Sequence, residues 1–377
     1  MSDLRDPRRA QGRRYPLRSV VVSALMAMVC GCDDAEAMEC WSEVNKDWLA
    51  GFLDMPHGPP TQDVYLSVLG ALEPAAFQAV FVRWAELVSL RLGGDPKHIA
   101  IDGKTSRRSA DRASGRAAIH TVSAWLSGAG LVLGQVQTRE KSNEIIAIPE
   151  LLKVLSLRGA TVTIDAMGSQ TDIAQAIVEG GGNYLLAVKD NQPTLHKEIR
   201  ETFAAADNPR SRTVDEVPRP VVSTHQQVDK EHGRIETREV RVVETLDWVL
   251  SKDRWVGLGY LVEVTRTRLH LTTGKESKET AHYIGSGPAP SVERVGALVR
   301  GHWSIENQLH WVLDMAFGED SARHRARHAA ANLTTLRHFA LSIVKQDQSR
   351  KLGIANSRRR AAFDRSYLVQ LIQGAGA

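Results

Sequence analysis

Cysteine is scarce in this chain of 377 residues, which contains three, all near the N-terminus. Their number is odd, and the spacing of Cys30, Cys32 and Cys40 fits neither a zinc ribbon nor a redox motif. The pattern argues against a disulfide-stabilised secreted fold and favours reduced cysteines in a protein core. We therefore expect a cytoplasmic protein.

Long hydrophobic runs are also lacking, because the apolar stretch over residues 19–32 is too short for a transmembrane helix. Basic residues precede this stretch and a small residue followed by cysteine ends it, as in the signal of a secreted lipoprotein. The mass of the mature N-terminus would separate that alternative from a buried first helix, which we favour. The basic residues are Arg8, Arg9, Arg13 and Arg14.

A strong net charge is absent as well, since the formal charge is +4 and charged residues make up 24% of the chain. Both values are ordinary for a soluble globular protein. Between Ser321 and Ser366, however, eleven basic residues stand against two acidic ones, which is typical of a nucleic-acid-binding segment. We predict a basic C-terminal tail over residues 351–377 in which Arg358, Arg359 and Arg360 contact DNA; a solvated helical face is the alternative.

Hydrophobic periodicity divides the chain into segments of different structure. Apolar residues recur at three- and four-residue steps through residues 34–92. This predicts a helical N-terminal domain over residues 1–95, which ends at a Gly-Gly-Asp-Pro linker. From residue 97 the period changes, and we predict strands at 98–102, 117–126, 131–138, 160–165 and 184–189, and helices at 144–157, 170–179 and 193–205.

Three strands followed by alternating helices and strands is the order of the RNase H-like mixed sheet, so the predicted fold class is α/β (α+β). Residues 207–290 are rich in Val, Thr, Arg and Glu with period-two runs, which predicts a β-rich insertion into this core. The pattern is helical from residue 291 onward. The catalytic domain is thus predicted over residues 96–206 and 291–350.

Two predicted strands end in an aspartate followed by small residues. Asp102 closes the run Ile99-Ala100-Ile101, and Asp165 closes the run from Ala160 to Ile164. In the RNase H-like order the first and fourth strands are neighbours, so these carboxylates should converge. A carboxylate at the end of a core strand needs a cation nearby, either Lys104 or a bound metal ion. A strand-end cap remains the alternative for each aspartate taken alone.

A C-terminal helix carries an acidic residue between two histidines. His302, Glu306 and His310 stand at four-residue steps and share one helix face. A helical zinc site is possible there, although the spacing H-E-x-x-H is absent, and surface pairing is the other alternative. Three further acids compete with Glu306 for the same role, namely Asp314, Glu319 and Asp320.

These motifs together resemble the DDE-type insertion-sequence transposases, most closely the H-repeat-associated (ISAs-type) group. The resemblance covers nearly the whole chain. It rests on Asp6-Pro7-Arg8, Ile101-Asp102-Gly103-Lys104, Lys141-Ser142-Asn143-Glu144, Ile164-Asp165-Ala166, Val188-Lys189-Asp190-Asn191-Gln192 and His302-Trp303-Ser304-Ile305-Glu306-Asn307, and continues through Leu309-His310-Trp311, Asn332 and Leu336-Arg337.

The resemblance implies a DNA transposase with Asp102, Asp165 and Glu306 as the catalytic and metal-binding residues. Carboxylates suit Mg²⁺, with Mn²⁺ as a substitute, and two ions would neutralise charge on the attacking and leaving oxygens. The implied partners are the inverted repeats of the element and target DNA, bound by a homodimer without any membrane. A decayed DNA-binding relic and an RNase H-like nuclease without strand transfer remain alternatives. Expected DNA contacts are Lys104, Lys141, Lys189, Asn191, Gln192, Arg300, His302, Trp303 and Asn307.

Overall fold

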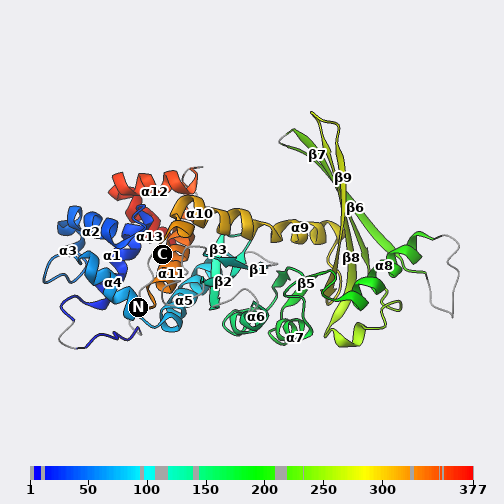
Figure 1. Ribbon diagram of the computed structural model, residues 1–377, viewed down its shortest axis with the longest axis horizontal. Coiled ribbons are helices and arrows are strands. Elements are labelled where there is room, and N and C mark those ends of the chain that lie inside the picture. Colours follow the sequence, from blue (N-terminus) through cyan, green and yellow to red (C-terminus); the bar gives the residue numbers. More distant parts are fainter. Residues whose placement is uncertain are drawn as a thin grey trace. The chain divides into compact units, whose positions relative to one another are not determined.

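The computed structural model describes residues 4–9, 13–93, 97–106, 118–138, 144–208, 219–231, 233–322, 327–347, 349 and 352–376. The chain divides into two compact units (Figure 1). The first comprises Met1–Gly93, Gly103–Asn143 and Ile305–Ala377, and the second Gly94–Asp102 and Glu144–Ser304. These boundaries cut across the predicted domains.

The first unit begins with helices, as the periodicity predicts. They are α1 (Leu17–Val29), α2 (Ala35–Val44), α3 (Lys46–Ala50), α4 (Gln62–Ala71) and α5 (Pro74–Leu92). The side chain of Asp34 accepts the N–H of Ala37 and caps α2, and Pro74 occupies the first turn of α5. Helix α1 is buried along most of its length, so the predicted buried first helix is confirmed.

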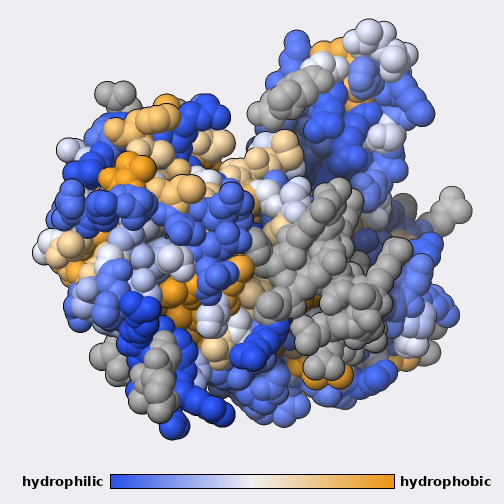
Figure 2. Space-filling model, turned by 60° about the vertical axis from the view of Figure 1, so that its left-hand side comes forward, coloured by the Kyte–Doolittle hydropathy of each residue, from blue (hydrophilic) through white to orange (hydrophobic). Residues whose placement is uncertain are grey.

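The described helices differ in length and apolar character. None of them is by itself long and apolar enough to cross a bilayer, whereas α4 and α5 satisfy the length and composition requirements only as a pair bent by 93°. On the face drawn in Figure 2, hydrophilic residues predominate and apolar residues form patches between them.

The rest of the first unit surrounds a buried helix, α11 (Ala329–Lys345). The side-chain amide of Asn332 donates to the backbone oxygens of Leu69 (2.7 Å) and Leu72 (3.0 Å), which anchors α11 to the end of α4. The other elements are β2 (His120–Leu126), β3 (Leu131–Thr138), α10 (Trp311–Phe317), α12 (Ile354–Phe363) and α13 (Arg365–Gly376). The predicted C-terminal tail therefore contains two helices.

The sheet has the order β3-β2-β1-β4-β5-β9-β8-β7-β6. Its first five strands follow the RNase H-like order that the sequence predicts. Strand β1 (His98–Thr105) pairs in parallel with β4 (Thr161–Ile164), and β4 pairs in parallel with β5 (Asn183–Val188). Helices α6 (Glu144–Lys153) and α7 (Thr171–Glu179) lie side by side, and α7 contacts β5 (Figure 1). Helix α8 (Pro193–Asp207) follows that strand in the chain.

The predicted β-rich insertion is confirmed as four antiparallel strands, β6 (Val222–Glu231), β7 (Arg234–Val243), β8 (Leu258–His270) and β9 (Glu276–Ser286). Strand β9 pairs with β5, so the insertion continues the core sheet and covers what would otherwise be an exposed edge strand. Helix α9 (Val292–His302) packs its apolar side chains Val295, Leu298 and Val299 onto valines of β7 and β8.

Candidate active site

Asp102 and Asp165 follow paired residues of two parallel strands. Ile101 of β1 is the partner of Ile164 of β4, so each aspartate is the residue after a paired one. Adjacent strands lie about 4.7–4.9 Å apart. Asp102 is half-buried and Asp165 is exposed. The structure thus confirms that the two strands are neighbours, but β1 continues past Asp102 to Thr105, whereas β4 ends at Ile164, so only Asp165 stands at a strand end as predicted.

The loop after β4 holds the Asp165 carboxylate in one orientation. Its Oδ1 accepts the backbone N–H of Met167 (3.0 Å) and of Gly168 (3.2 Å). A Cβ on Gly168 would lie 2.4 Å from Cγ2 of Ile164, so only glycine permits this close return of the chain. The Ser169 hydroxyl donates to the backbone oxygen of Ala187 on β5 (2.5 Å). The sequence signal for this loop was the small residues after Asp165; the role of Ser169 was missed.

The motif after β5 supports the same loop. The amide of Asn191 donates to the backbone oxygen of Ala166, and that of Gln192 donates to the backbone oxygen of Ser169 (3.0 Å). Because these amide donors are already used, the predicted DNA contacts of Asn191 and Gln192 gain no support from the structure. The side chain of Lys189 is exposed and can reach a phosphate.

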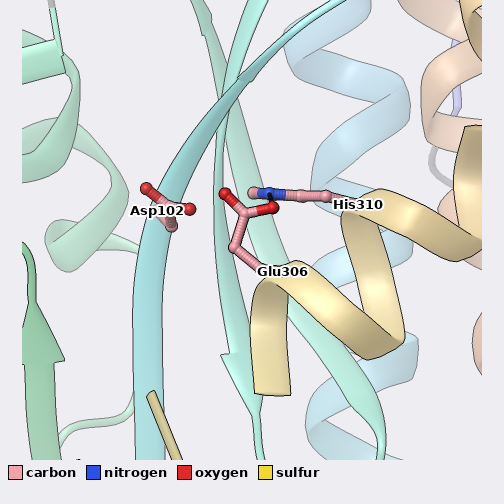
Figure 3. Close-up of side chains that lie close together, drawn as sticks. All are labelled: Asp102, Glu306 and His310. Atoms are coloured by element: carbon pink, nitrogen blue, oxygen red, sulfur yellow. Dashed lines mark ion pairs between the residues drawn. The ribbon is translucent and has the colours of Figure 1, made fainter. Parts of the chain in front are cut away.

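Glu306 lies in the first unit, in a π-helical segment, Glu306–His310, that leads directly into α10. Its carboxylate lies 3.5 Å from Nδ1 of His310, one turn later, as Figure 3 shows together with Asp102 on β1. The Glu306 side chain is 51% exposed, whereas His310 is 5% exposed. Asp102, Glu306 and His310 each offer an atom that can ligate a metal ion. The predicted continuous helix is thus interrupted by a π segment, which often marks functional sites.

The three acids that competed with Glu306 share one lysine as their ion-pair partner. Nζ of Lys104 lies 2.8 Å from Asp314, 3.3 Å from Glu319 and 3.4 Å from Asp320. Burial works to lower the pKa of Lys104, but the charges of Glu319 and its two neighbours outweigh it and raise the pKa. With 11% of its side chain exposed, Lys104 is not available for DNA, so the predicted phosphate contact is wrong.

Among the predicted DNA contacts, those near the end of α9 differ in exposure. Trp303 is 52% exposed, and the side chain of Asn307 is exposed. Arg300 is ion-paired with Asp229 at 2.7 Å and is still 47% exposed. Nδ1 of His302 is 3.0 Å from the Thr163 hydroxyl. Lys141 lies outside the described residues.

The arginines of α12 divide into interior and surface residues. Arg358 is 3% exposed, donates to the backbone oxygen of Met28 and pairs with Asp33, so its predicted DNA contact is wrong. Arg359 is exposed. Arg360 stacks on the ring of Tyr367 at 3.9 Å. The number of positive charges is evident from the sequence, but the side of the helix that faces the interior is not.

Comparison with known families matches residues 93–343 to the family described as "Transposase DDE domain" and residues 1–85 to "DDE_Tnp_1-associated". Two Escherichia coli K12 relatives, "Putative protein YbfL" and "H repeat-associated putative transposase YhhI", are each 35% identical to this chain. Each comparison covers 100% of this chain and 97% of the relative. Among solved structures, the piggyBac transposase synaptic complex with hairpin DNA aligns over 94% of this chain and 73% of that chain, with a TM-score of 0.42 and 11% identity.

Proposed function

Because this chain belongs to the family of transposases with a DDE domain, we propose that it cuts DNA at the ends of its own insertion element and joins those ends to target DNA. Asp102, Asp165 and Glu306 are the metal-binding and catalytic residues in this proposal. The observation that carries it is the placement of Asp102 and Asp165 directly after paired residues of two parallel strands.

The donor set fits a hard divalent cation. Three carboxylates match the preference of Mg²⁺ for oxygen ligands, and Mn²⁺ accepts the same ligands together with imidazole. His310, next to Glu306, can orient that carboxylate or add a nitrogen ligand. Two bound ions, about 3.5–4 Å apart in such sites, would activate the attacking oxygen and stabilise the leaving oxygen.

The remaining residues position the DNA. Exposed Trp303 offers an aromatic face on which a base can stack. Lys189 and Arg359 offer exposed positive charges for phosphates, and Arg300 and Asn307 can add hydrogen bonds. We further propose that the protein acts in the bacterial cytoplasm, as a homodimer on the two element ends and without a membrane.

Charge-removing variants test the metal assignment. Asp102→Asn, Asp165→Asn and Glu306→Gln should each abolish strand cleavage while leaving DNA affinity within about threefold, because only the metal ligands are altered. Each should also raise or leave unchanged the melting temperature without metal, since carboxylate repulsion is relieved. Metal at 100 times its dissociation constant stabilises by about 2.7 kcal/mol, and the variants should lose most of this gain.

Glu201→Gln is the matched control, because Glu201 is an exposed helical glutamate of α8. It should cleave DNA and respond to Mn²⁺ like the unmodified protein. Variants of the three acids that still cut DNA would refute the assignment. An unmodified protein that binds the element ends but neither cuts them nor binds Mn²⁺ would instead identify a decayed DNA-binding relic.

A further inference from the structure

A hydrogen-bonded chain of three side chains, two of them buried and the third, His302, half-buried, connects β1, β4 and α9 within the second unit. Nε2 of His98 is 2.8 Å from the Thr163 hydroxyl oxygen, and the same oxygen is 3.0 Å from Nδ1 of His302. His98 is 7% and Thr163 is 3% exposed. We call these three residues the His-Thr-His joint, and we propose that it is a positioning device for the metal-binding carboxylates.

The spacing of the joint along the chain supports this role. His98 stands four residues before Asp102, Thr163 two residues before Asp165, and His302 four residues before Glu306. Side chains two or four apart on a strand point to the same face of the sheet. His98 and Thr163 therefore lie on the sheet face that also carries Asp102, and Asp165 follows on the same side directly after the end of β4. The inference rests on the proposed function, since it assumes that these carboxylates bind metal.

The Thr163 hydroxyl can donate a hydrogen bond to only one of the two histidine rings at a time. A threonine hydroxyl donates a single hydrogen, so it can donate to one imidazole while it accepts from the other. Burial, with smaller contributions from the charges of His302 and Arg294, lowers the pKa of His98 to about 3, so this ring is neutral at neutral pH. The tautomers of the two rings are thereby coupled through Thr163. Breaking either bond would leave a buried polar group unsatisfied, which disfavours movement of the strands against α9.

Close packing of α9 reinforces the joint. A Cβ on Gly301 would lie 2.8 Å from Nδ1 and 2.9 Å from Cε1 of the His98 ring. The helix can approach β1 this closely only because residue 301 is glycine. Two independent features, the hydrogen bonds and the glycine contact, thus fix the end of α9 on β1 and β4 just before the chain continues to Glu306.

The decisive variant is Thr163→Val, which keeps the shape of the side chain and removes the hydroxyl. We expect the DNA cleavage rate to fall at least tenfold and the affinity for Mn²⁺, measured by calorimetric titration, to fall about 10- to 100-fold, as for other groups that orient metal ligands. DNA affinity should stay within about threefold. Thr163→Ser restores the hydroxyl and should recover both quantities to within about threefold.

Thr161→Val is the matched control, because Thr161 lies on the same strand and face and is 9% exposed. In the described part of the chain its hydroxyl has no hydrogen-bond partner, so this variant should keep cleavage and Mn²⁺ affinity. Gly301→Ala is a second test that keeps all three joint side chains while displacing the His98 ring. It should lower Mn²⁺ affinity at least tenfold, and it decides the matter if Thr163→Val does not fold.

Three outcomes would overturn the positioning role. Thr163→Val could match Thr161→Val in cleavage and Mn²⁺ affinity, Thr163→Ser could be as impaired as Thr163→Val, or Gly301→Ala could bind Mn²⁺ normally. In each case the unmodified protein would still cut DNA, so the proposed function would survive. An unmodified protein that neither cuts DNA nor binds Mn²⁺ would overturn both the proposed function and the inference.

Discussion

Replacing Arg358 by alanine should destabilise the protein far more than it weakens DNA binding. Two nitrogens of the guanidinium donate to the backbone oxygen of Met28, at 3.1 Å and 2.8 Å, and a third donates to that of Ala316. The same group pairs with Asp33 and stacks on the Phe317 ring at 3.8 Å. These contacts join α1, α10 and α12 within the first unit. The substitution therefore removes the side chain that connects the three helices.

The expected cost follows from the burial of Arg358 and the partial burial of Asp33. Removing one partner of a fully buried pair costs about 3–5 kcal/mol; because Asp33 is 31% exposed, water partly solvates the carboxylate left behind, and the cost should lie near the lower end of that range. Burial already raises the pKa of Asp33 against the opposing charge of Arg358, and loss of that charge should raise it further. A carboxylate whose pKa is raised in the folded state lowers the free energy of unfolding at pH values above its unfolded-state pKa. The variant should therefore be weakest near pH 7 and recover part of its stability as the pH falls through the raised pKa of Asp33 toward its unfolded value.

Urea denaturation followed by circular dichroism measures this cost directly. Arg359→Ala is the neighbouring control, and it should change stability by about 0.5 kcal/mol or less because its side chain is exposed. It should instead weaken binding to all DNA sequences and reduce the salt dependence by about one phosphate contact. If Arg358→Ala were as stable as Arg359→Ala, or if it alone changed the salt dependence, the structural role of Arg358 would be refuted.

Two further predictions concern buried lysines. Lys104→Met should cost about 3–5 kcal/mol at pH 7, because Glu319 and its neighbours lose their shared cation. Burial raises the pKa of Asp314, so the cost should be smaller at pH 4 than at pH 7; equal costs at both pH values in urea titrations would contradict this. Burial lowers the pKa of Lys345 to about 8. Between pH 8 and 10.5 the unfolded chain therefore binds a proton that the folded chain does not, and the free energy of unfolding rises with pH across that window. Lys345→Met should therefore stabilise the protein by about 1–3 kcal/mol at pH 7 and by nothing near pH 10.5. If the variant were less stable than the unmodified protein at pH 7, the interactions of the charge would outweigh the cost of burying it, and the prediction would be wrong.

Much of the fold follows from local pattern. From residue 97 the hydrophobic periodicity alternates between that of strands and that of helices, which predicts the order of these elements. In the RNase H-like sheet that order makes β1 and β4 neighbours. Asp102 and Asp165 could therefore be placed side by side from the sequence, since each follows a paired residue of two neighbouring parallel strands, although the continuation of β1 past Asp102 to Thr105 was not predicted. The β-rich insertion was likewise readable from its period-two runs.

Pairings between distant residues could not be predicted in this way. Lys104 and Asp314 are 210 residues apart, and nothing in either local sequence indicates that they form an ion pair. The interior position of Arg358 was hidden for a similar reason, because a run of three arginines gives the charge of a segment and not the side that packs. The His-Thr-His joint joins three elements whose contact is visible only in the folded chain.

The most direct test of the account is the position of DNA breaks on the gene's own flanking DNA. Purified protein would be incubated with Mg²⁺ and a supercoiled plasmid that carries the gene and its natural flanks, and the broken ends would be sequenced. The account predicts breaks at two boundaries marked by short inverted repeats, and none with the Asp165→Asn variant. Breaks scattered over the plasmid, or breaks that persist undiminished in that variant, would contradict it.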